Sequence, residues 1–455
     1  MREFHRARLL AAGLIATLLL PSLVRAAAMT FPSDSIGRES WQLANGLRVV
    51  TLNVTGAQAV AITVVYPGGR DQDLRGNEGL SVLLGELQFT AAAGNVPERS
   101  RTELMSLRPL GYDIKVSRRY TAFTELASPV QFPGVLAQVA ARMRGVNPTP
   151  EVFASALEGA RRQLRAQFFS DPAQALYYEV RELASRADTA SIRRLATGRG
   201  LERLTLRDVQ PRLAAAFRAS SAVMCIAGNL AGLPLKPLIE NELGGLPTGA
   251  PALPPSGLPF GPGAGIEPRG DIDAPVGVIG VLAPALADTL HPAFYLSLLV
   301  MGIQANQLWG PPAPPLVSRF QYALFDDPDL VRFYPAADSE TVDPAGLAES
   351  FSQGMGQISR TLARGDELIP LRQGVGWLLG GPPTAGMLRR IRAESGALNT
   401  LAWSTAVREL WGGEAFWSNY RDRFNGIESV PTDYWAVQLS DPRKQVRLLY
   451  RPIPK

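Results

Sequence analysis

The sequence predicts an α+β fold built as two similar lobes, each a mostly antiparallel sheet layered with helices, joined by a segment rich in proline and glycine. Three observations predict it. Each half begins with an apolar strand followed by a long helix. In the first half, further segments with helical spacing of apolar residues follow. Between the halves, residues 246–270 contain seven prolines. Helices layered on antiparallel strands define the α+β class.

The first half, predicted as a lobe over residues 36–245, begins with two strands. Residues 46–52 and 59–66 are apolar and rich in β-branched side chains, which favours strands. A turn at Pro67-Gly68-Gly69 then leads to a helix predicted at 78–89. Apolar residues at helical spacing predict three further helices, at 135–144, 150–168 and 173–184.

The second half, predicted as a lobe over residues 271–455, opens with a strand at 276–282 and a helix at 292–307. Between the lobes, residues 246–270 are predicted to be a semi-rigid linker. Because proline lacks the amide that helices and central strands need, we expect this linker neither to continue a helix nor to pair in a sheet.

The N-terminus has the pattern of an export signal. Basic residues precede an apolar run from Leu9 to Leu20, Pro21 ends the run, and small residues follow at 26–28. This run is shorter than the roughly 20 residues of a membrane-spanning helix but fits a signal peptide. We expect residues 1–28 to be removed, and the mature chain, which has no other long apolar stretch, to be periplasmic or secreted without a membrane span.

Charge and composition exclude several function classes. The net charge is +5, and residues 1–28 carry three of these charges, so the mature chain is close to neutral and lacks the basic stripe of a nucleic-acid-binding protein. The single cysteine, Cys225, excludes an intramolecular disulfide. The mature chain keeps one histidine, His291, so one copy cannot build a site with two histidine ligands. Because Pro292 suits a first helical turn, His291 is expected to be a capping or surface residue.

Five short segments occur in the order found in a known peptidase family. They are Asn45–Val49, the loop Pro67–Asp71, the helix Gly79–Phe89, the turn Leu110–Asp113 and the turn Ala227–Leu230. Their order and spacing resemble the pitrilysin/insulinase family of zinc metallopeptidases, which includes the mitochondrial processing peptidase. The resemblance covers nearly all of the chain after the signal and implies two lobes of related fold.

The resemblance also implies that the zinc site is degenerate. The family motif H-x-x-E-H places two histidine ligands on one helical face, and its glutamate takes a proton from the metal-bound water. Carried onto this sequence, the histidines fall on Val82 and Glu86 and the glutamate base falls on Gly85. Valine cannot bind a metal, and glycine cannot act as a base.

A more distant glutamate supplies the third zinc ligand in the family. The equivalent position falls within Gln163–Gln167, where no carboxylate is present; in a shifted register, Glu158 would take this place. Two carboxylates without an imidazole would hold zinc poorly. The resemblance therefore implies no catalytic residue, metal ligand or cofactor in this chain.

Small bacterial members of the family enclose a chamber with two chains, of which one can lack zinc. By this resemblance we expect the chain to pair with a zinc-bearing homologue and, as a subunit, to take part in peptide cleavage. In such chains a tyrosine and an arginine of the second lobe hold substrate, and Tyr322 and Arg319 are the matching candidates here. Alternatively, Tyr322 alternates with Phe320 and Leu324 on an ordinary strand.

Two other classes of function compete with this one. A serine hydrolase is not indicated, because no G-x-S-x-G turn is present and one histidine has no triad context. A stand-alone peptide-binding or structural subunit remains the alternative to the paired peptidase subunit.

Overall fold

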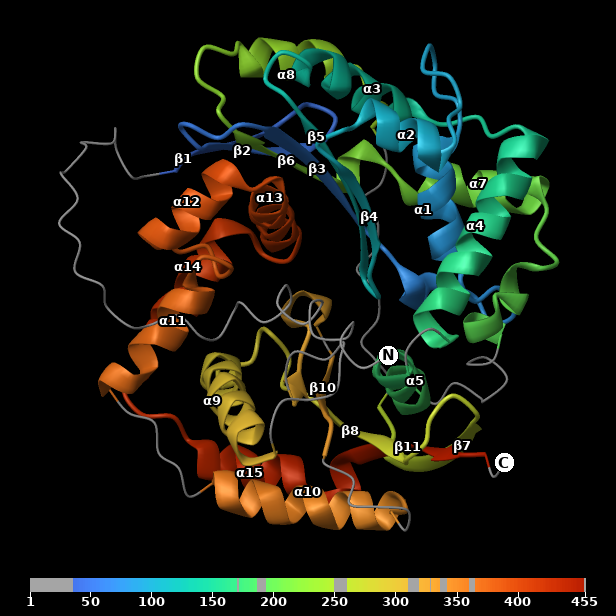
Figure 1. The fold of residues 1–455 in the computed structure, drawn as a ribbon. Helices are drawn as coiled ribbons and strands as arrows, with labels where there is room; N and C mark the ends of the chain where they lie inside the picture. The colour runs from blue at the N-terminus through green and yellow to red at the C-terminus, as the bar shows by residue number, and fades with distance from the viewer. Residues whose placement is uncertain are drawn as a thin grey trace, which may run out of the picture. The chain divides into compact units, whose positions relative to one another are not determined.

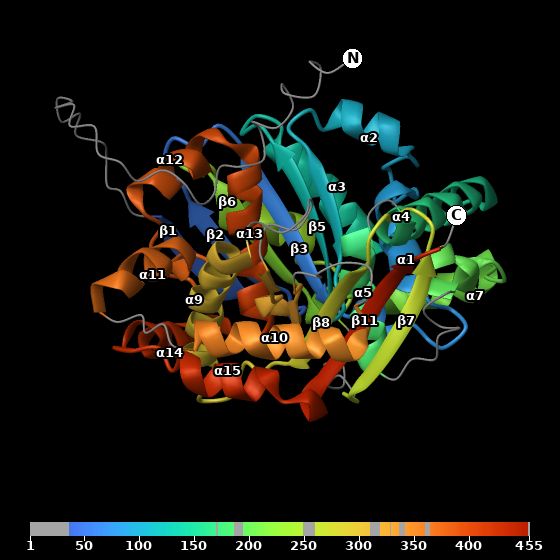
Figure 2. The same ribbon diagram turned by 60° about the horizontal axis from the view of Figure 1, so that its bottom comes forward.

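Two sheets, each layered with helices, form the part of the chain that the structure describes (Figures 1 and 2). The structure is a computed structural model, and it describes residues 36–169, 172–185, 194–248, 260–309, 319–327, 329–335, 342–359 and 365–453. The predicted signal peptide lies outside the described residues.

The elements of the first half are β1 (Gly37–Gln42), β2 (Arg48–Asn53), β3 (Val60–Pro67), α1 (Leu80–Thr90), α2 (Arg101–Leu107), β4 (Tyr112–Val116), β5 (Tyr120–Ala127), α3 (Phe132–Arg144), α4 (Pro150–Phe169), α5 (Pro172–Ala184), α7 (Leu206–Ala216), β6 (Val223–Gly228) and α8 (Leu235–Leu243). Those of the second half are β7 (Gly263–Arg269), β8 (Val276–Leu282), α9 (His291–Trp309), β9 (Phe320–Gln321), β10 (Leu330–Phe333), α10 (Pro344–Ile358), α11 (Ile369–Gly376), α12 (Ala385–Ala393), α13 (Ser395–Leu410), α14 (Gly413–Asn425), α15 (Thr432–Ser440) and β11 (Gln445–Pro452). The strands predicted at the start of each half are confirmed as β2, β3 and β8, and the helices that follow them as α1 and α9.

The two sheets share one topology. The first has the order β1-β2-β6-β3-β5-β4 and the second β7-β11-β8-β10-β9. The pairs β2–β6 and β7–β11 are parallel, whereas all other pairs are antiparallel. Apart from the additional strand β1, the sheets match strand for strand, which confirms the α+β class and the two related lobes.

One expectation about the linker is wrong. Residues 263–269, at the end of the predicted linker, form β7 and pair in parallel with β11. Pro268 is compatible with this strand because β7 lies at the edge of its sheet, where one side of the backbone has no ladder to support. Residues 249–259 of the linker lie outside the described residues.

Both faces of the first sheet are apolar. Along β3, Ile62, Val64 and Tyr66 pack on the side of α1 and α3, whereas Ala61 and Val65 pack on the side of α13. Every residue of β3 and β6 is buried. A sheet covered on both faces needs apolar residues at successive positions, which explains why these strands read as continuous apolar runs.

Helix α13, from the second half, covers the second of these faces (Figure 1). Its residues Ala402 and Ala406 share one apolar cluster with Ala61, Cys225 and Ala227 of the sheet. Small side chains on both surfaces allow the helix to lie close to the strands. Cys225 is buried in this cluster.

Helix α5, from the first half, covers a face of the second sheet in the same way (Figure 1). Leu176 and Val180 of α5 belong to one apolar cluster with Val278, Leu330 and Val446. Each half therefore supplies a helix to the sheet of the other half. As a result, residues 35–455 form one compact unit.

A buried carboxylate, Asp329, joins the two halves electrostatically. It accepts two hydrogen bonds from Arg332 (2.7 and 2.9 Å) and lies 3.1 Å from Nε of Arg181 and 3.9 Å from Nη1 of Arg118. Burial alone would raise the pKa of Asp329, but the guanidinium groups of Arg181, Arg332 and Arg118 lower it. Arg118 also binds Asp71 at 2.8 and 2.5 Å, which extends the cluster into the first half.

We expect Asp329→Asn to lower the free energy of unfolding by about 3–5 kcal/mol, because it leaves buried guanidinium groups without their counter-charge. The Asp329 contribution should be present above the pKa of an unfolded aspartate and be lost as the pH falls through its lower folded value. Urea unfolding at neutral and acid pH measures both effects. Glu394→Gln is the matched control, since its ion pair with Arg390 is exposed and should contribute little to the free energy of unfolding. Equal losses for the two variants would contradict this role of Asp329.

Candidate functional site

Helix α1 begins at a partly buried carboxylate. Asp73 accepts hydrogen bonds from the backbone N–H groups of Gly79 (2.8 Å) and Ser81 (2.8 Å) and from the Ser81 hydroxyl (2.5 Å). Burial raises the pKa of Asp73 to about 7 against the effect of these bonds. Gly79 has φ of 94°, which glycine adopts without steric cost. This cap fixes the helix that carries the predicted motif positions.

Two motif positions face apolar surroundings. Val82 is 3% exposed and belongs to the main apolar cluster of the first lobe. Gly85 lies under β4, so that a Cβ atom at this position would meet Cγ2 of Val116 at 3.2 Å and Cγ2 of Ile114 at 3.4 Å. Strand β4 therefore occupies the space that a longer side chain at position 85 would need.

The third motif position, Glu86, is held by an arginine. Glu86 is 4% exposed, and Nε of Arg101 lies 2.7 and 3.0 Å from its two carboxylate oxygens, while Nη2 of Arg101 also binds the carboxylate. The hydrogen bonds that Arg101 donates to the Glu86 carboxylate raise the pKa of Arg101. Arg101 also donates to Oε1 of Gln163 at 3.4 Å. The sequence motifs did not identify Arg101, which begins α2 directly after the capping residue Ser100.

Glu86 and Arg101 line a cleft of about 510 Å³ between α1, α2 and α4. Charged side chains of both signs surround the Glu86–Arg101 pair in this cleft: Glu98, Arg99, Glu103, Glu151 and Arg162. The cleft can accept polar groups of a peptide. It presents no histidine.

The fold family implies a zinc ion on this helix, but the residues do not fit one. Position 82 is apolar, position 85 has no side chain and lies tightly against β4, and the Glu86 carboxylate is bound by a guanidinium. A cation beside Glu86 would have to displace Arg101. Within the described part of the chain, no group of three histidine, cysteine, aspartate or glutamate side chains is arranged to hold a metal.

The candidates for a third ligand lie on α4. Glu158 is about half-exposed and lies 3.6 Å from Nη1 of Arg162 and 4.0 Å from Nη1 of Arg161. Gln163 has an amide where a zinc ligand would need a carboxylate, and this amide contacts Arg101. The structure thus brings Glu86 and Gln163 to one arginine, whereas Glu158 pairs with arginines of its own helix.

His291 differs from its prediction. It is fully buried, with Nδ1 2.8 Å from the Tyr420 hydroxyl and Nε2 2.8 Å from the Tyr322 hydroxyl, so the expectation of a surface histidine is wrong. Burial lowers the pKa of His291 to about 3, so the neutral ring donates to one tyrosine and accepts from the other. The two partners come from distant segments, and for this reason the local sequence did not reveal the burial.

The two predicted substrate-binding residues lie in the second lobe. Tyr322 hydrogen-bonds His291 and packs edge-on against Phe294. The backbone amide of Arg319 donates to Oδ1 of Asn306 at 2.9 Å, and its Nη1 donates to the Tyr334 carbonyl at 3.1 Å. Both residues contribute to the packing of the second lobe, and their contact with substrate stays a prediction.

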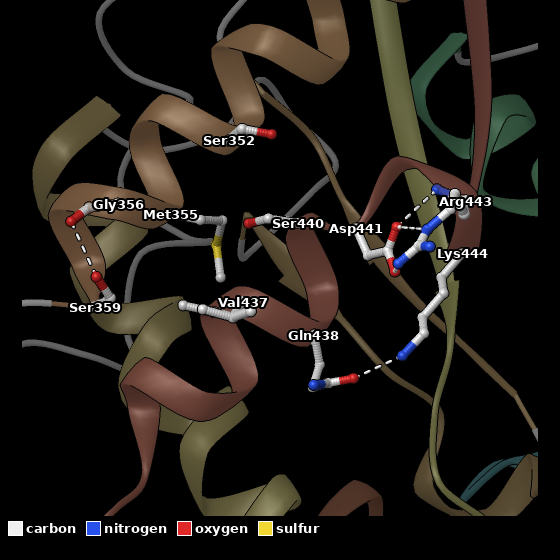
Figure 3. A pocket seen from close by; sticks show the side chains of 11 residues that line it. Ser352, Met355, Gly356, Ser359, Val437, Gln438, Ser440, Asp441, Arg443 and Lys444 are labelled. Atoms are coloured by element: carbon white, nitrogen blue, oxygen red, sulfur yellow. Dashed lines mark hydrogen bonds and ion pairs between the residues drawn. The ribbon is translucent and has the colours of Figure 1, made fainter.

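A second hollow, of about 590 Å³, lies between α10 and α15 (Figure 3). Its charged residues are paired beside it: Arg443 binds Asp441 at 2.9 and 3.0 Å, and Lys444 donates to Gln438 at 2.6 Å. The Ser352 hydroxyl donates to a carbonyl of its own helix. These contacts give the hollow less chemical specificity than the cleft at Glu86.

No family model matches the sequence, and no curated protein matches it either. Solved structures do match. A protease from Helicobacter pylori superposes with a TM-score of 0.71 at 12% identity, over 92% of this chain and 100% of that one. The chain has the M16 peptidase fold.

Two further solved structures match nearly the whole chain. The peptidase M16 inactive domain from Pseudomonas fluorescens has a TM-score of 0.63 at 12% identity, covering 92% of this chain and 98% of that chain. The periplasmic protease PqqL from Escherichia coli has a TM-score of 0.63 at 13% identity, covering 91% of this M16-fold chain but 47% of PqqL. The likeness to these structures shows a shared fold. No helix among the described residues has the length and apolar character needed to cross a bilayer.

We expect the purified M16-fold chain to retain no stoichiometric zinc after dialysis. The triple change Val82→His, Gly85→Glu and Glu86→His should still not create a functional zinc site, because Gln163 supplies no carboxylate and a glutamate side chain at position 85 would collide with Ile114 and Val116. The collision should also lower the free energy of unfolding by about 1–3 kcal/mol.

Metal analysis and urea unfolding test both expectations. The control is the double change Val82→His and Glu86→His, which leaves Gly85 and the contact with β4 in place. One tightly bound zinc per wild-type chain would refute the account of this site.

Proposed function

We propose that this chain is an exported, non-catalytic subunit that pairs with a zinc-bearing homologue of the same fold, and that the pair cleaves peptides or unfolded proteins. The observation that carries the proposal is the Glu86–Arg101 ion pair on the helix where the family binds zinc. A chain built this way would fold and bind peptide, while the described residues at the three motif positions would take no part in the hydrolytic step.

Several observations support this proposal. The cleft of about 510 Å³ beside Glu86 is lined with polar and charged groups that suit a peptide backbone. One structural neighbour is named an inactive M16 domain and another a periplasmic protease. Residues 1–28 have the composition of an export signal. Any zinc in the assembly would belong to the partner, and neither nucleic acid nor a membrane span is part of the proposal.

The decisive experiment is to mix the mature chain with a homologue from the same organism that carries H-x-x-E-H, then measure complex formation and cleavage of an unstructured peptide. The mixture should form a stable complex on size exclusion at micromolar concentration and should cleave faster than either chain alone. If the homologue alone is as fast as the mixture, or no complex forms, pairing fails. The stand-alone peptide-binding or structural subunit then becomes the better account.

Tyr322 offers a narrower test of how the subunit would contribute. Tyr322→Phe keeps the packed ring and removes the hydroxyl that binds His291. If this hydroxyl also positions substrate, kcat/KM of the complex should fall about ten- to a hundredfold, equivalent to roughly 1–3 kcal/mol, with the complex intact. Tyr434→Phe is the control, because Tyr434 is 48% exposed. Unchanged cleavage by Tyr322→Phe would remove Tyr322 from the substrate site.

A further inference from the structure

Strand β7 has an open edge where its counterpart in the first lobe is covered. By topology β7 corresponds to β2, and the outer edge of β2 pairs with β1 over residues 37–42. No described strand pairs with the outer edge of β7. An uncovered edge presents a row of backbone donors and acceptors and readily accepts another strand.

The direction of these backbone groups can be assigned. The Arg269 carbonyl accepts a hydrogen bond from the amide of Ile453, just after β11, so it faces β11. Backbone groups of successive strand residues alternate in direction, so those of Ala264, Ile266 and Pro268 face the open edge. Ile266 is 45% exposed. A strand added here could pair with the amides and carbonyls of Ala264 and Ile266.

A cavity of about 580 Å³ adjoins β7 on the side of α5. A Cβ atom on Gly265 would lie 3.5 Å from Cδ2 of Leu183 in α5, so alternate side chains of β7 face this cavity. Its apolar walls include Leu183 and Leu448. Because side chains of an added strand also alternate between the two faces, every second one would point into the cavity.

The cavity has an excess of negative charge. Glu179, Glu267 and Asp271 line it together with one guanidinium, that of Arg269. Arg269 binds Asp271 at 2.6 and 3.0 Å, whereas Glu179 and Glu267 form no ion pair with another described residue. Burial raises the pKa of Glu179 to about 7; the Tyr450 hydroxyl and the Arg269 guanidinium oppose this rise, whereas the neighbouring Glu267 carboxylate adds to it. A cationic side chain in the cavity would relieve this repulsion.

We propose that β7 and the adjoining cavity bind an extended peptide segment, which adds a strand to the second sheet and places a lysine or arginine side chain between Glu179 and Glu267. The open edge supplies backbone pairing, as in other cases of strand addition. The apolar walls accommodate the aliphatic part of the basic side chain, and the two carboxylates bind its charge. This site goes beyond the proposed pairing and depends on neither a partner chain nor cleavage.

The test uses the mature chain alone and a fluorescent peptide of alternating threonine and valine with one central lysine. A twin peptide carries glutamate at the centre. The lysine peptide should bind at least about tenfold more tightly. Glu267→Gln should reduce this preference, whereas the control Glu428→Gln, at an exposed site on another segment, should leave it unchanged. Equal affinity for the two peptides would overturn the cationic pocket.

Strand addition is tested separately at Ile266. Ile266→Pro removes an amide donor from the open edge and should weaken binding at least about tenfold, whereas Ile266→Thr keeps the donor and should bind as the wild type does. Hydrogen exchange gives an independent measurement on the wild-type chain, in which the Ala264 and Ile266 amides should exchange more slowly when the lysine peptide is bound. Unchanged exchange at these amides, with peptide bound, would overturn strand addition even if the proline variant is unstable.

Discussion

The architecture depends on one constraint: both faces of each sheet are apolar and must be covered. Strand β3 buries alternate residues on opposite sides, and β8 does the same in the second lobe. Each half covers one face of its sheet with its own helices, and α13 and α5 from the opposite halves cover the others. The buried cluster around Asp329 lies among segments of both halves and can form only when they are docked. Covering the sheets therefore buries the charged residues around Asp329. Because these charges are buried, each must lie beside a charge of opposite sign.

The same requirement shapes the candidate site. Helix α1 is buried along its whole length, so its residues are selected mainly for packing against β4, α4 and the sheet. Gly85 permits the close approach of β4, and Glu86 is tolerated in this setting because Arg101 reaches it from α2. The helix is therefore well built as a structural element. Of its three motif positions, only Glu86 carries a charge, and Arg101 neutralises this carboxylate beside the polar cleft.

Much of the fold could be predicted from the sequence, because strong local patterns coincide with the final elements. The apolar runs that became β3 and β8 and the periodic segments that became α3 and α4 needed no tertiary information. Features set by distant contacts could not be predicted in this way. Strand β7 exists because β11 lies beside it, His291 is buried because two remote tyrosines satisfy its ring, and Arg101 has a role only once α2 meets α1. The motif alignment identified the positions of the site, but not the groups that occupy the space around them.

The position of α13 bears on how the polypeptide can mature. Residues 60–67 of β3 are synthesised long before the helix that covers one face of this strand, which spans residues 395–410. Until then the alanine-rich face of the first sheet has no cover, and such exposed apolar surface makes a partly made chain prone to aggregate. Long-range contacts of this kind also slow folding, because a large loop must close before they form. The nascent N-terminal portion should therefore depend on being kept unfolded until α13 has left the ribosome.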